Sequence, residues 1–293
     1  MKRPSHRVLL HPEGGSRYAA RMRTLVLTSV LLLVAAACRA PESADPPPAD
    51  LAALVAGSEL VDLTHAFDAE TIVWPTSKPF RLETVADGMT PGGYYYAAND
   101  VFTSEHGGTH LDAPVHFAEG RQTADVVPLS RLIGSAAVVD VTRQAEADAD
   151  YLVTAADLEA WETAHGRLAP RTIVLLRTGF SSRWPDAARY LGTAERGAEA
   201  AADLRFPGLH PDAATWLVEE RDVGAVGIDT ASIDRGQSTM FEAHRVLAAA
   251  DVPIFENFTR LDALPARGAV VVALPMKLAG GSGGPLRAIA IVP

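Results

Sequence analysis

Residues 104–117 read SEHGGTHLDAPVHF, and the interpretation of the whole chain starts from this stretch. It contains three of the nine histidines, His106, His110 and His116, together with Asp112. A helix would place the first two histidines on one face, but two consecutive glycines and a following proline disfavour a helix here. We therefore predict a glycine turn that leads into a short extended segment, in which His110 and Asp112 point to the same side. The turn at the two glycines lets His106 join them.

Two imidazoles and a carboxylate that converge on one point form a site suited to a divalent metal such as Zn²⁺ or Mn²⁺. A single histidine is more often a hydrogen-bonded polar residue than a metal ligand, so ordinary packing is the alternative explanation. Three histidines and an aspartate beside a Gly-Gly pair are harder to explain by packing, and the pattern favours a metal site. The spacing alone does not say what the metal does.

The stretch resembles the signature of the cyclase family of metal-dependent hydrolases, which includes bacterial kynurenine formamidases (arylformamidases) and isatin hydrolases. The similarity continues in the same order at residues 226–234 (VGIDTASID), at Ala243-His244 and at Phe255-Glu256-Asn257. It extends over nearly all of the chain from about Glu59 onward. The resemblance implies a single α/β domain over residues 59–293 with a mixed sheet, the swivelling β/β/α fold of this family, and a homodimer.

By this resemblance, His106, His110 and Asp112 bind the principal metal. In the formamidases a later His and Glu hold a second metal, with the aspartate bridging the two. His244 and Glu256 match those two positions. Isatin hydrolases are associated with a single manganese, so the resemblance leaves open Zn or Mn, and one or two metals per chain.

Three further residues are assigned to the reaction or the substrate. Gln237 resembles a glutamine that helps to hold metal-bound water in isatin hydrolases. His116 can titrate near neutral pH, which suits it to pass a proton to the departing amine, although it could instead only orient a ligand. Trp74, in a Trp-Pro pair like that of the formamidases, is a pocket wall or a core residue. The tyrosines at 94–96 are candidates to line the substrate cleft, but at most some of them can do so, because consecutive side chains of a strand point to opposite faces.

These residues imply hydrolysis of a C–N bond by metal-activated water. The first expectation for the substrate is an aryl formamide like N-formylkynurenine, which would place the protein in tryptophan catabolism. The second is an isatin-like cyclic amide or imide. The alternative from another class is a catalytically inactive, lipid-anchored binding protein, but the complete set of matching residues argues against it.

Other segments predict the order of the elements. Alternating or fully apolar runs predict strands, at residues 59–64, 136–141, 171–177, 223–228, 252–256 and 269–274. Capping-box patterns predict helix starts at Thr154–Asp157 and at Thr239–Glu242, and Pro211 fits the first turn of a third helix. Residues 186–205 are rich in alanine and charge, which indicates a surface helix or an ordered insertion.

The amino-terminal part of the chain is typical of an export signal, assigned to residues 1–37. Basic residues precede an apolar run at residues 25–34, and small residues follow; the run is shorter than the about 20 residues of a membrane span. Cys38, the single cysteine, comes next, as in a bacterial lipoprotein box, although Ala35 stands where leucine is usual. Simple cleavage near Ala37 is the alternative.

Residues 38–58 are expected to be a lipidated cysteine followed by a Pro/Ala-rich tether, and Met22 is an alternative start of the chain. Residues 1–37 contain six Lys/Arg and one Glu, so the net charge changes from −10 to about −15 without them. Such an acidic chain argues against nucleic acid and against electrostatic binding to anionic lipid. We expect an exported lipoprotein of the cell envelope or periplasm, held at the membrane only by its lipid, that acts on a small amide.

Overall fold

The computed structural model describes residues 55–293, which belong to one compact unit, Asp50–Pro293. The predicted export signal, Cys38 and most of the predicted tether lie outside the described residues. The strands are β1 (Glu59–Asp62), β2 (Arg81–Met89), β3 (Tyr95–Phe102), β4 (His110–Asp112), β5 (Ile133–Asp140), β6 (Leu152–Val153), β7 (Ile173–Arg177), β8 (Gly208–Leu209), β9 (Ala225–Ile228), β10 (Ile254–Glu256), β11 (Arg267–Pro275) and β12 (Gly283–Val292). The helices are α3 (Leu129–Leu132), α4 (Thr142–Ala147), α5 (Ala155–His165), α6 (Ala187–Leu191), α7 (Pro211–Glu219) and α8 (Glu242–Ala249), with 3₁₀ turns η1 (Pro114–His116), η2 (Phe180–Arg183), η3 (Glu199–Asp203) and η4 (Leu261–Ala263).

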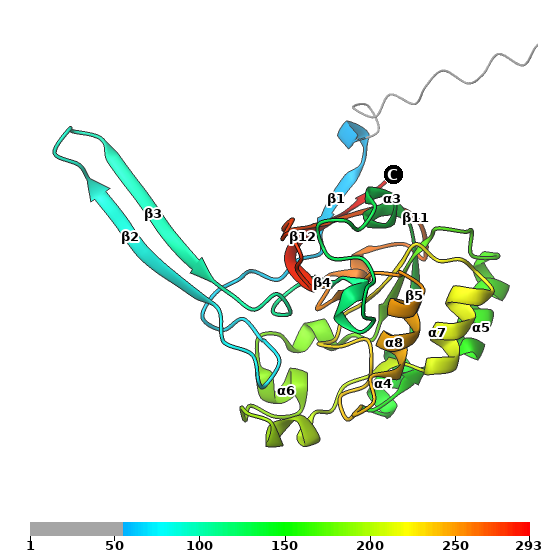
Figure 1. Cartoon of the computed structure of the whole chain (residues 1–293). Coiled ribbons are helices and arrows are strands. Elements are labelled where there is room, and N and C mark those ends of the chain that lie inside the picture. The colour runs from blue at the N-terminus through cyan, green and yellow to red at the C-terminus, as the bar shows by residue number, and fades with distance from the viewer. Residues whose placement is uncertain (1–54) are drawn as a thin grey trace, which may run out of the picture. The chain divides into compact units, whose positions relative to one another are not determined.

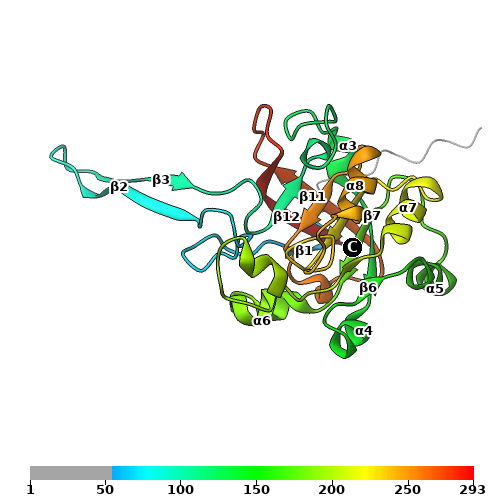
Figure 2. The same ribbon diagram turned by 60° about the horizontal axis from the view of Figure 1, so that its bottom comes forward.

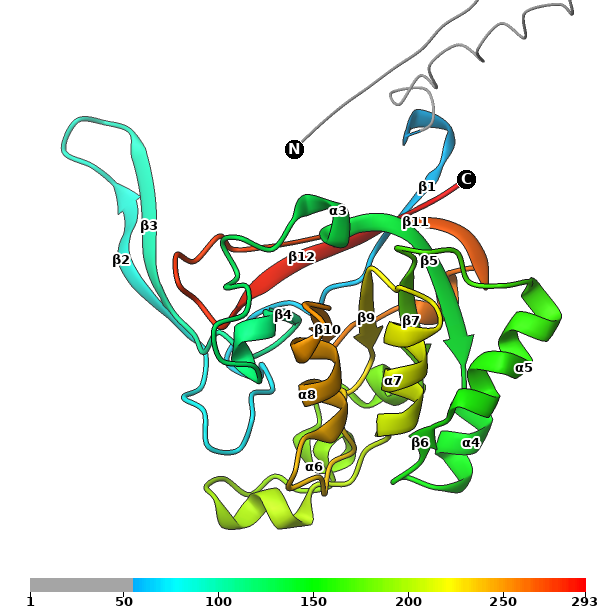
Figure 3. The same ribbon diagram turned by 45° about the vertical axis from the view of Figure 1, so that its right-hand side comes forward.

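The main sheet is mixed, as predicted, and it curls back on itself. Its order is β1-β12-β11-β5-β7-β9-β10-β4, and β4 also pairs with β12. Neighbouring strands are parallel along the run β5-β7-β9-β10. Every pair that involves β1, β4, β11 or β12 is antiparallel. Helices α5, α7 and α8 cover the parallel strands from outside (Figure 3). The short strand β4 is therefore held on both sides, by β10 and by β12.

Both faces of the central strands are buried, which explains their continuous apolar sequences. In β7, Ile173 and Leu175 pack into the core inside the curled sheet. Val174 and Leu176 point the other way and pack under the helices. The predicted strands are all present, and in the central ones the apolar run meets a core on either side.

Two of the three predicted helix starts are confirmed, and one is wrong. Thr154 forms a capping box with Asp157 at the start of α5, and Pro211 lies in the first turn of α7. Thr239 does not cap α8: the N-cap is Phe241, with a φ of 48° and no capping side chain of its own. The Asp234 carboxylate, from an earlier loop, takes over this role by accepting hydrogen bonds from the first free N–H groups of the helix.

The strands β2 and β3 form a separate hairpin that extends away from the main sheet (Figures 1 and 2). Tyr94, Tyr95 and Tyr96 lie on this hairpin and are 53–63% exposed. The prediction that they line the substrate cleft of their own chain is wrong, because the hairpin carries them away from it. None of the helices in the described residues is long and apolar enough to cross a membrane.

Residues 186–205 form an ordered insertion rather than a long surface helix. Helix α6 and the turn η3 lie in it. Tyr190 and Leu191 of α6 pack in a third apolar cluster with Phe180 and Phe206. The insertion is therefore tied to the domain by its own small core.

Candidate metal centre

Strand β4 and the turn before it bring three predicted ligands together. His110 and Asp112 lie on the same side of β4 and are 2% and 3% exposed, while Leu111 points into the core. Gly108 has a φ of +60°, and a methyl group there would lie 2.5 Å from the ring of Phe67. This turn carries His106 back over the strand, so that its Nδ1 lies 2.7 Å from Asp112 Oδ1.

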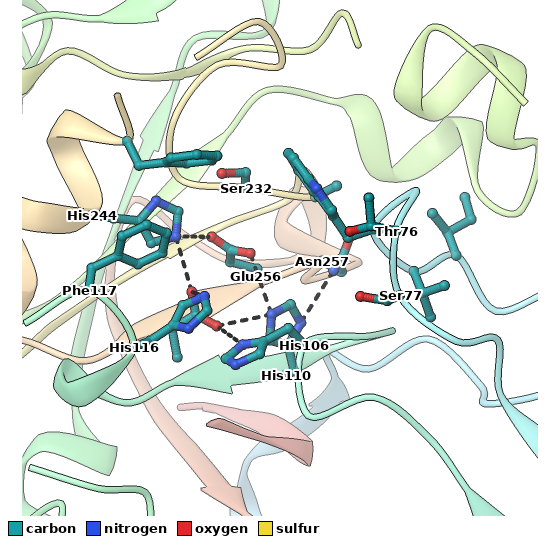
Figure 4. A pocket seen from close by; sticks show the side chains of 16 residues that line it. Thr76, Ser77, His106, His110, His116, Phe117, Ser232, His244, Glu256 and Asn257 are labelled. Carbon is teal, nitrogen blue, oxygen red and sulfur yellow. Dashed lines mark hydrogen bonds and ion pairs between the residues drawn. The ribbon is translucent and has the colours of Figure 1, made fainter. Parts of the chain in front are cut away.

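Two further predicted ligands come from distant segments. Because β10 pairs with β4, Glu256 lies opposite His110, and its Oε2 is 3.4 Å from His110 Nε2. His244 reaches the same place from α8: its Nε2 lies 3.0 Å from Asp112 Oδ2 and 3.1 Å from Glu256 Oε1. Figure 4 shows these side chains converging on the floor of one pocket.

The side chains form two groups that share Asp112. One consists of His106, His110 and Asp112, and the other of Asp112, His244 and Glu256; within each group the ligand atoms lie within 4.8 Å of one another. The Oδ1 atom of Asp112 faces the first group and its Oδ2 atom faces the second. This geometry agrees with the predicted bridging position of the aspartate.

The orientation of His110 fits a metal ligand. Its Nδ1–H donates to the carbonyl of Gly108 at 2.8 Å, so the lone pair of Nε2 points into the site. This buried Nε2 has no hydrogen-bond partner among the described residues, although it lies 3.1 Å from Asp112 Oδ1. A buried nitrogen that faces two carboxylates but forms no hydrogen bond lacks a partner, and a bound cation would supply one.

The other two histidines of these groups, His244 and His106, also direct a nitrogen lone pair into the site. His244 Nδ1 lies 2.6 Å from Asp234 Oδ2, a carboxylate–histidine contact that typically holds a metal-binding imidazole. His106 Nε2 lies 2.8 Å from the Ser282 hydroxyl, which itself donates to Glu105. The serine therefore accepts from Nε2–H, and the Nδ1 lone pair of His106 faces Asp112.

The charges of the site also favour a cation. Burial alone lowers the pKa of His110, but contacts with Asp112 and Glu256 raise that pKa overall. Burial and the charge of Asp112 raise the pKa of Glu256. Two buried carboxylates facing each other repel unless positive charge lies between them. Nitrogen and oxygen donors of this kind suit Zn²⁺ or Mn²⁺.

His116 lies beside the ligands without joining either group. Its ring stacks on that of His106 at 3.8 Å between centroids, with 17° between the planes. Its Nε2 is 4.0 Å from Asp112 Oδ2, too far for a hydrogen bond. Burial lowers the pKa of His116 to about 4. The prediction that His116 titrates near neutral pH is therefore wrong, because burial keeps the imidazole neutral there; the neutral ring can still accept a proton.

The pocket above these groups encloses about 280 Å³ and has aromatic walls. Trp74, Phe117 and Phe241 line it, so Trp74 is part of the wall, one of its two predicted positions. Gln237 does not line this pocket. It follows Gly236, which packs closely against Leu204, and it lines a separate hollow with Asp234 and Met240.

Sequence reasoning missed two residues that support the site. Asp234 entered only as the last residue of the motif at residues 226–234, but it holds both His244 and the start of α8. Asn257 was noted only as part of a motif, but its side chain donates to the carbonyl of Gly108 that orients His110. Their positions at the ends of two motifs were the only signal in the sequence.

Comparisons with known proteins agree with this geometry. A family model described as "Putative cyclase" matches residues 61–235. An isatin hydrolase from Roseibium aggregatum is 34% identical over 209 residues, 69% of this chain and 77% of that protein. A kynurenine formamidase from Sphingopyxis alaskensis is 32% identical over 237 residues, 79% of this chain and 97% of that protein.

A solved structure is also similar. Isatin hydrolase A from Ralstonia solanacearum superposes with a TM-score of 0.74 at 32% identity, covering 86% of this chain and 100% of that one. The chain belongs to the cyclase family, and its fold is the mixed-sheet α/β fold found in isatin hydrolases.

Proposed function

We propose that this protein is a metal-dependent hydrolase that opens a cyclic amide fused to an aromatic ring, of the isatin type. The observation that carries the proposal is the pocket, whose floor holds two groups of metal-ligating side chains and whose walls are Trp74, Phe117 and Phe241. Aromatic walls of this kind bind a flat ring through stacking and edge contacts. The similarity to isatin hydrolases in sequence and structure supports this choice.

The reaction adds water across the amide C–N bond: the water oxygen bonds to the carbonyl carbon, and a proton reaches the nitrogen as that bond breaks. A divalent metal held by the two groups, when bound, lowers the pKa of a water molecule and polarises the carbonyl. His116, neutral at neutral pH, accepts a proton from the attacking water and returns it to the nitrogen. Asp234 and the carbonyl of Gly108 keep His244 and His110 in their binding orientations.

An aryl formamide of the N-formylkynurenine type is the second candidate. The similarity to kynurenine formamidases favours it. So does the second ligand group, since His244 and Glu256 match the residues that hold a second metal in those enzymes. Both candidates are aromatic amides, and they differ in whether the scissile bond lies in a ring.

Turnover of a small substrate panel tests the proposal. Isatin, an aryl formamide and an aryl ester would be compared by kcat/KM with the purified protein and added Mn²⁺ or Zn²⁺. We expect the highest value with isatin, and His110→Ala, which removes a ligand, should abolish it. A formamide preferred over isatin would support the second candidate. Bound metal without turnover of either amide would support the inactive binding protein instead.

We also propose that the enzyme is a homodimer formed through the β2–β3 hairpin. An isolated two-stranded hairpin is at best marginally stable in water, and this one exposes Leu82, Val85, Val101 and Phe102, each at least 45% exposed. A second copy offers the same surface, so a two-fold contact covers both.

Sedimentation of the purified protein tests the dimer. Leu82 and Val101 are cross-strand partners, so Leu82→Lys with Val101→Glu replaces their apolar contact by an ion pair and should give monomers. Val126→Lys, at an exposed valine outside the hairpin, is the control and should leave the dimer intact. A monomeric wild-type protein would contradict the proposal.

Finally, we propose that the chain is exported and anchored by lipid on Cys38. The proposal rests on the apolar run at residues 25–34 followed by small residues and the single cysteine.

A further inference from the structure

One side chain of the insertion reaches the metal centre from behind. Tyr190, on α6, is completely buried, and its hydroxyl lies 2.8 Å from the Oδ1 atom of Asn257. A hydroxyl has one hydrogen to donate, and the alternative acceptor, the backbone oxygen of Asp229, is farther away at 3.2 Å. Tyr190 therefore donates to the carbonyl oxygen of the Asn257 side chain.

Asn257 links Tyr190 to His110 through the carbonyl of Gly108. Its Nδ2 donates to the Gly108 carbonyl at 2.7 Å, and the same carbonyl accepts the Nδ1–H of His110 at 2.8 Å. The backbone of Asn257 is fixed as well, because its N–H donates to the Thr230 carbonyl and its own carbonyl accepts the Thr109 hydroxyl. Its φ of 56° is one that asparagine adopts more readily than most residues.

The Gly108 carbonyl, which can only accept, fixes which way the Asn257 amide faces, and the hydroxyl of Tyr190 holds the amide there by bonding its oxygen. An amide turned over by 180° would place its oxygen against the Gly108 carbonyl, so that two acceptors would meet. With Oδ1 bound to the tyrosine, Nδ2 faces Gly108 and holds its carbonyl in place. That carbonyl in turn keeps the Nε2 atom of His110 directed at Asp112 and Glu256.

We propose that Tyr190 is a positioning residue of the metal centre that acts through Asn257 on His110. The inference deepens the proposed function, because it rests on a metal being bound by His110. It also gives the insertion at residues 186–205 a role, which is to deliver one hydroxyl to the back of the site.

A double-mutant cycle on metal affinity tests the chain of contacts. The full-length protein, Tyr190→Phe, Asn257→Gly and the double variant would be titrated with Mn²⁺ and Zn²⁺ in competition with a chromogenic chelator. Glycine accepts the positive φ at position 257, so that variant keeps the backbone. We expect about 10-fold weaker binding for Tyr190→Phe and about 10–100-fold for Asn257→Gly. The double variant should bind like Asn257→Gly alone, because the tyrosine acts only through the amide.

Tyr151→Phe is the matched control. It removes a tyrosine hydroxyl that is bonded to Asp157 at 2.8 Å, at the start of α5, and that does not line the metal pocket. It should leave the metal Kd unchanged whatever it does to the melting temperature. Unchanged Kd in Tyr190→Phe, or additive losses in the double variant, would overturn the positioning role alone. A wild-type protein without affinity for either metal would overturn the metal centre and this role with it.

Discussion

His116 is the residue on which the proposed chemistry depends most directly. Its ring stacks on His106, a predicted metal ligand, so a small replacement would disturb that side chain as well as remove the nitrogen atoms of His116. His116→Phe keeps an aromatic ring in the stack. We expect this variant to bind metal normally and to lose about 10²–10⁴-fold in turnover, the usual contribution of general acid–base catalysis. Metal content and turnover would be measured on one preparation.

The other role considered for His116 gives a different result. If it only orients a ligand, metal affinity should fall about 10–100-fold, and excess metal should restore activity. Normal metal binding together with normal turnover would exclude both roles and would move the proton transfer to another residue.

The sequence indicated the clustered histidines and carboxylates of the site, but not the residues that support them. His106, His110 and Asp112 lie within seven residues, so the backbone periodicity of a turn and a strand is enough to bring them together. Asp234 and Tyr190 act across a fold whose register the sequence does not state. A carboxylate ten residues before a histidine, or a tyrosine 67 residues before an asparagine, has no local pattern that predicts contact.

Gly283 shows how the pairing of two elements shapes the site. It is the first residue of β12 and pairs with Asp112 on β4. A methyl group there would lie 2.4 Å from the Leu111 carbonyl and 2.6 Å from the His106 ring. Gly283→Ala should therefore push His106 aside and reduce metal affinity, which calorimetric titration would measure.

Gly134→Ala on β5 is the matched change for this prediction. A methyl group at Gly134 meets nothing closer than 3.4 Å, so metal affinity should be unaffected. If Gly283→Ala binds metal as tightly as Gly134→Ala, the close packing of His106 against β12 does not hold the site.

Among the elements, the sequence best predicts the strands that are packed on both faces. The central residues of β5, β7 and β9 are apolar on both faces, because each face meets a core. The hairpin β2–β3 gives no such signal, since none of its residues belongs to a core cluster of the described residues 55–293. The strand β12 also escapes prediction, because it begins with Gly283, Gly284 and Pro285, which are typical of a loop, although these residues pair with β4.

At the scale of the whole molecule, the titration of His65 makes the free energy of unfolding depend on pH. His65 stacks on Trp184 at 4.2 Å, and burial lowers its pKa from 6.5 to about 4. Between these values the unfolded chain takes up a proton that the folded chain does not. The stabilisation is therefore present above pH 6.5 and is lost as the pH falls toward 4, by about 2–3 kcal/mol.

His65→Phe keeps a ring on Trp184 but cannot titrate. Urea unfolding between pH 4 and pH 7 should show a shallower loss of stability at low pH than in the wild type. Parallel stability curves for the two proteins would contradict the assignment to His65.

The expected anchor belongs to the whole molecule too. Wild-type protein expressed in a bacterial host should partition with membranes and carry an added lipid mass. Cys38→Ser should release an active enzyme, because the predicted tether at residues 38–58 precedes the first strand. A wild-type protein that is fully soluble and begins at another residue after processing would rule out the anchor.

The dependence of turnover on metal tests the central claim most directly. Metal-stripped protein would be titrated with Mn²⁺ or Zn²⁺ while bound metal and hydrolysis of isatin and of an aryl formamide are followed on the same samples. Two ligand groups that share Asp112 predict no turnover without metal, recovery in proportion to metal bound, and saturation near two ions per chain. His244→Ala should lower the saturation to one ion. Full hydrolysis by the metal-free protein would contradict the account.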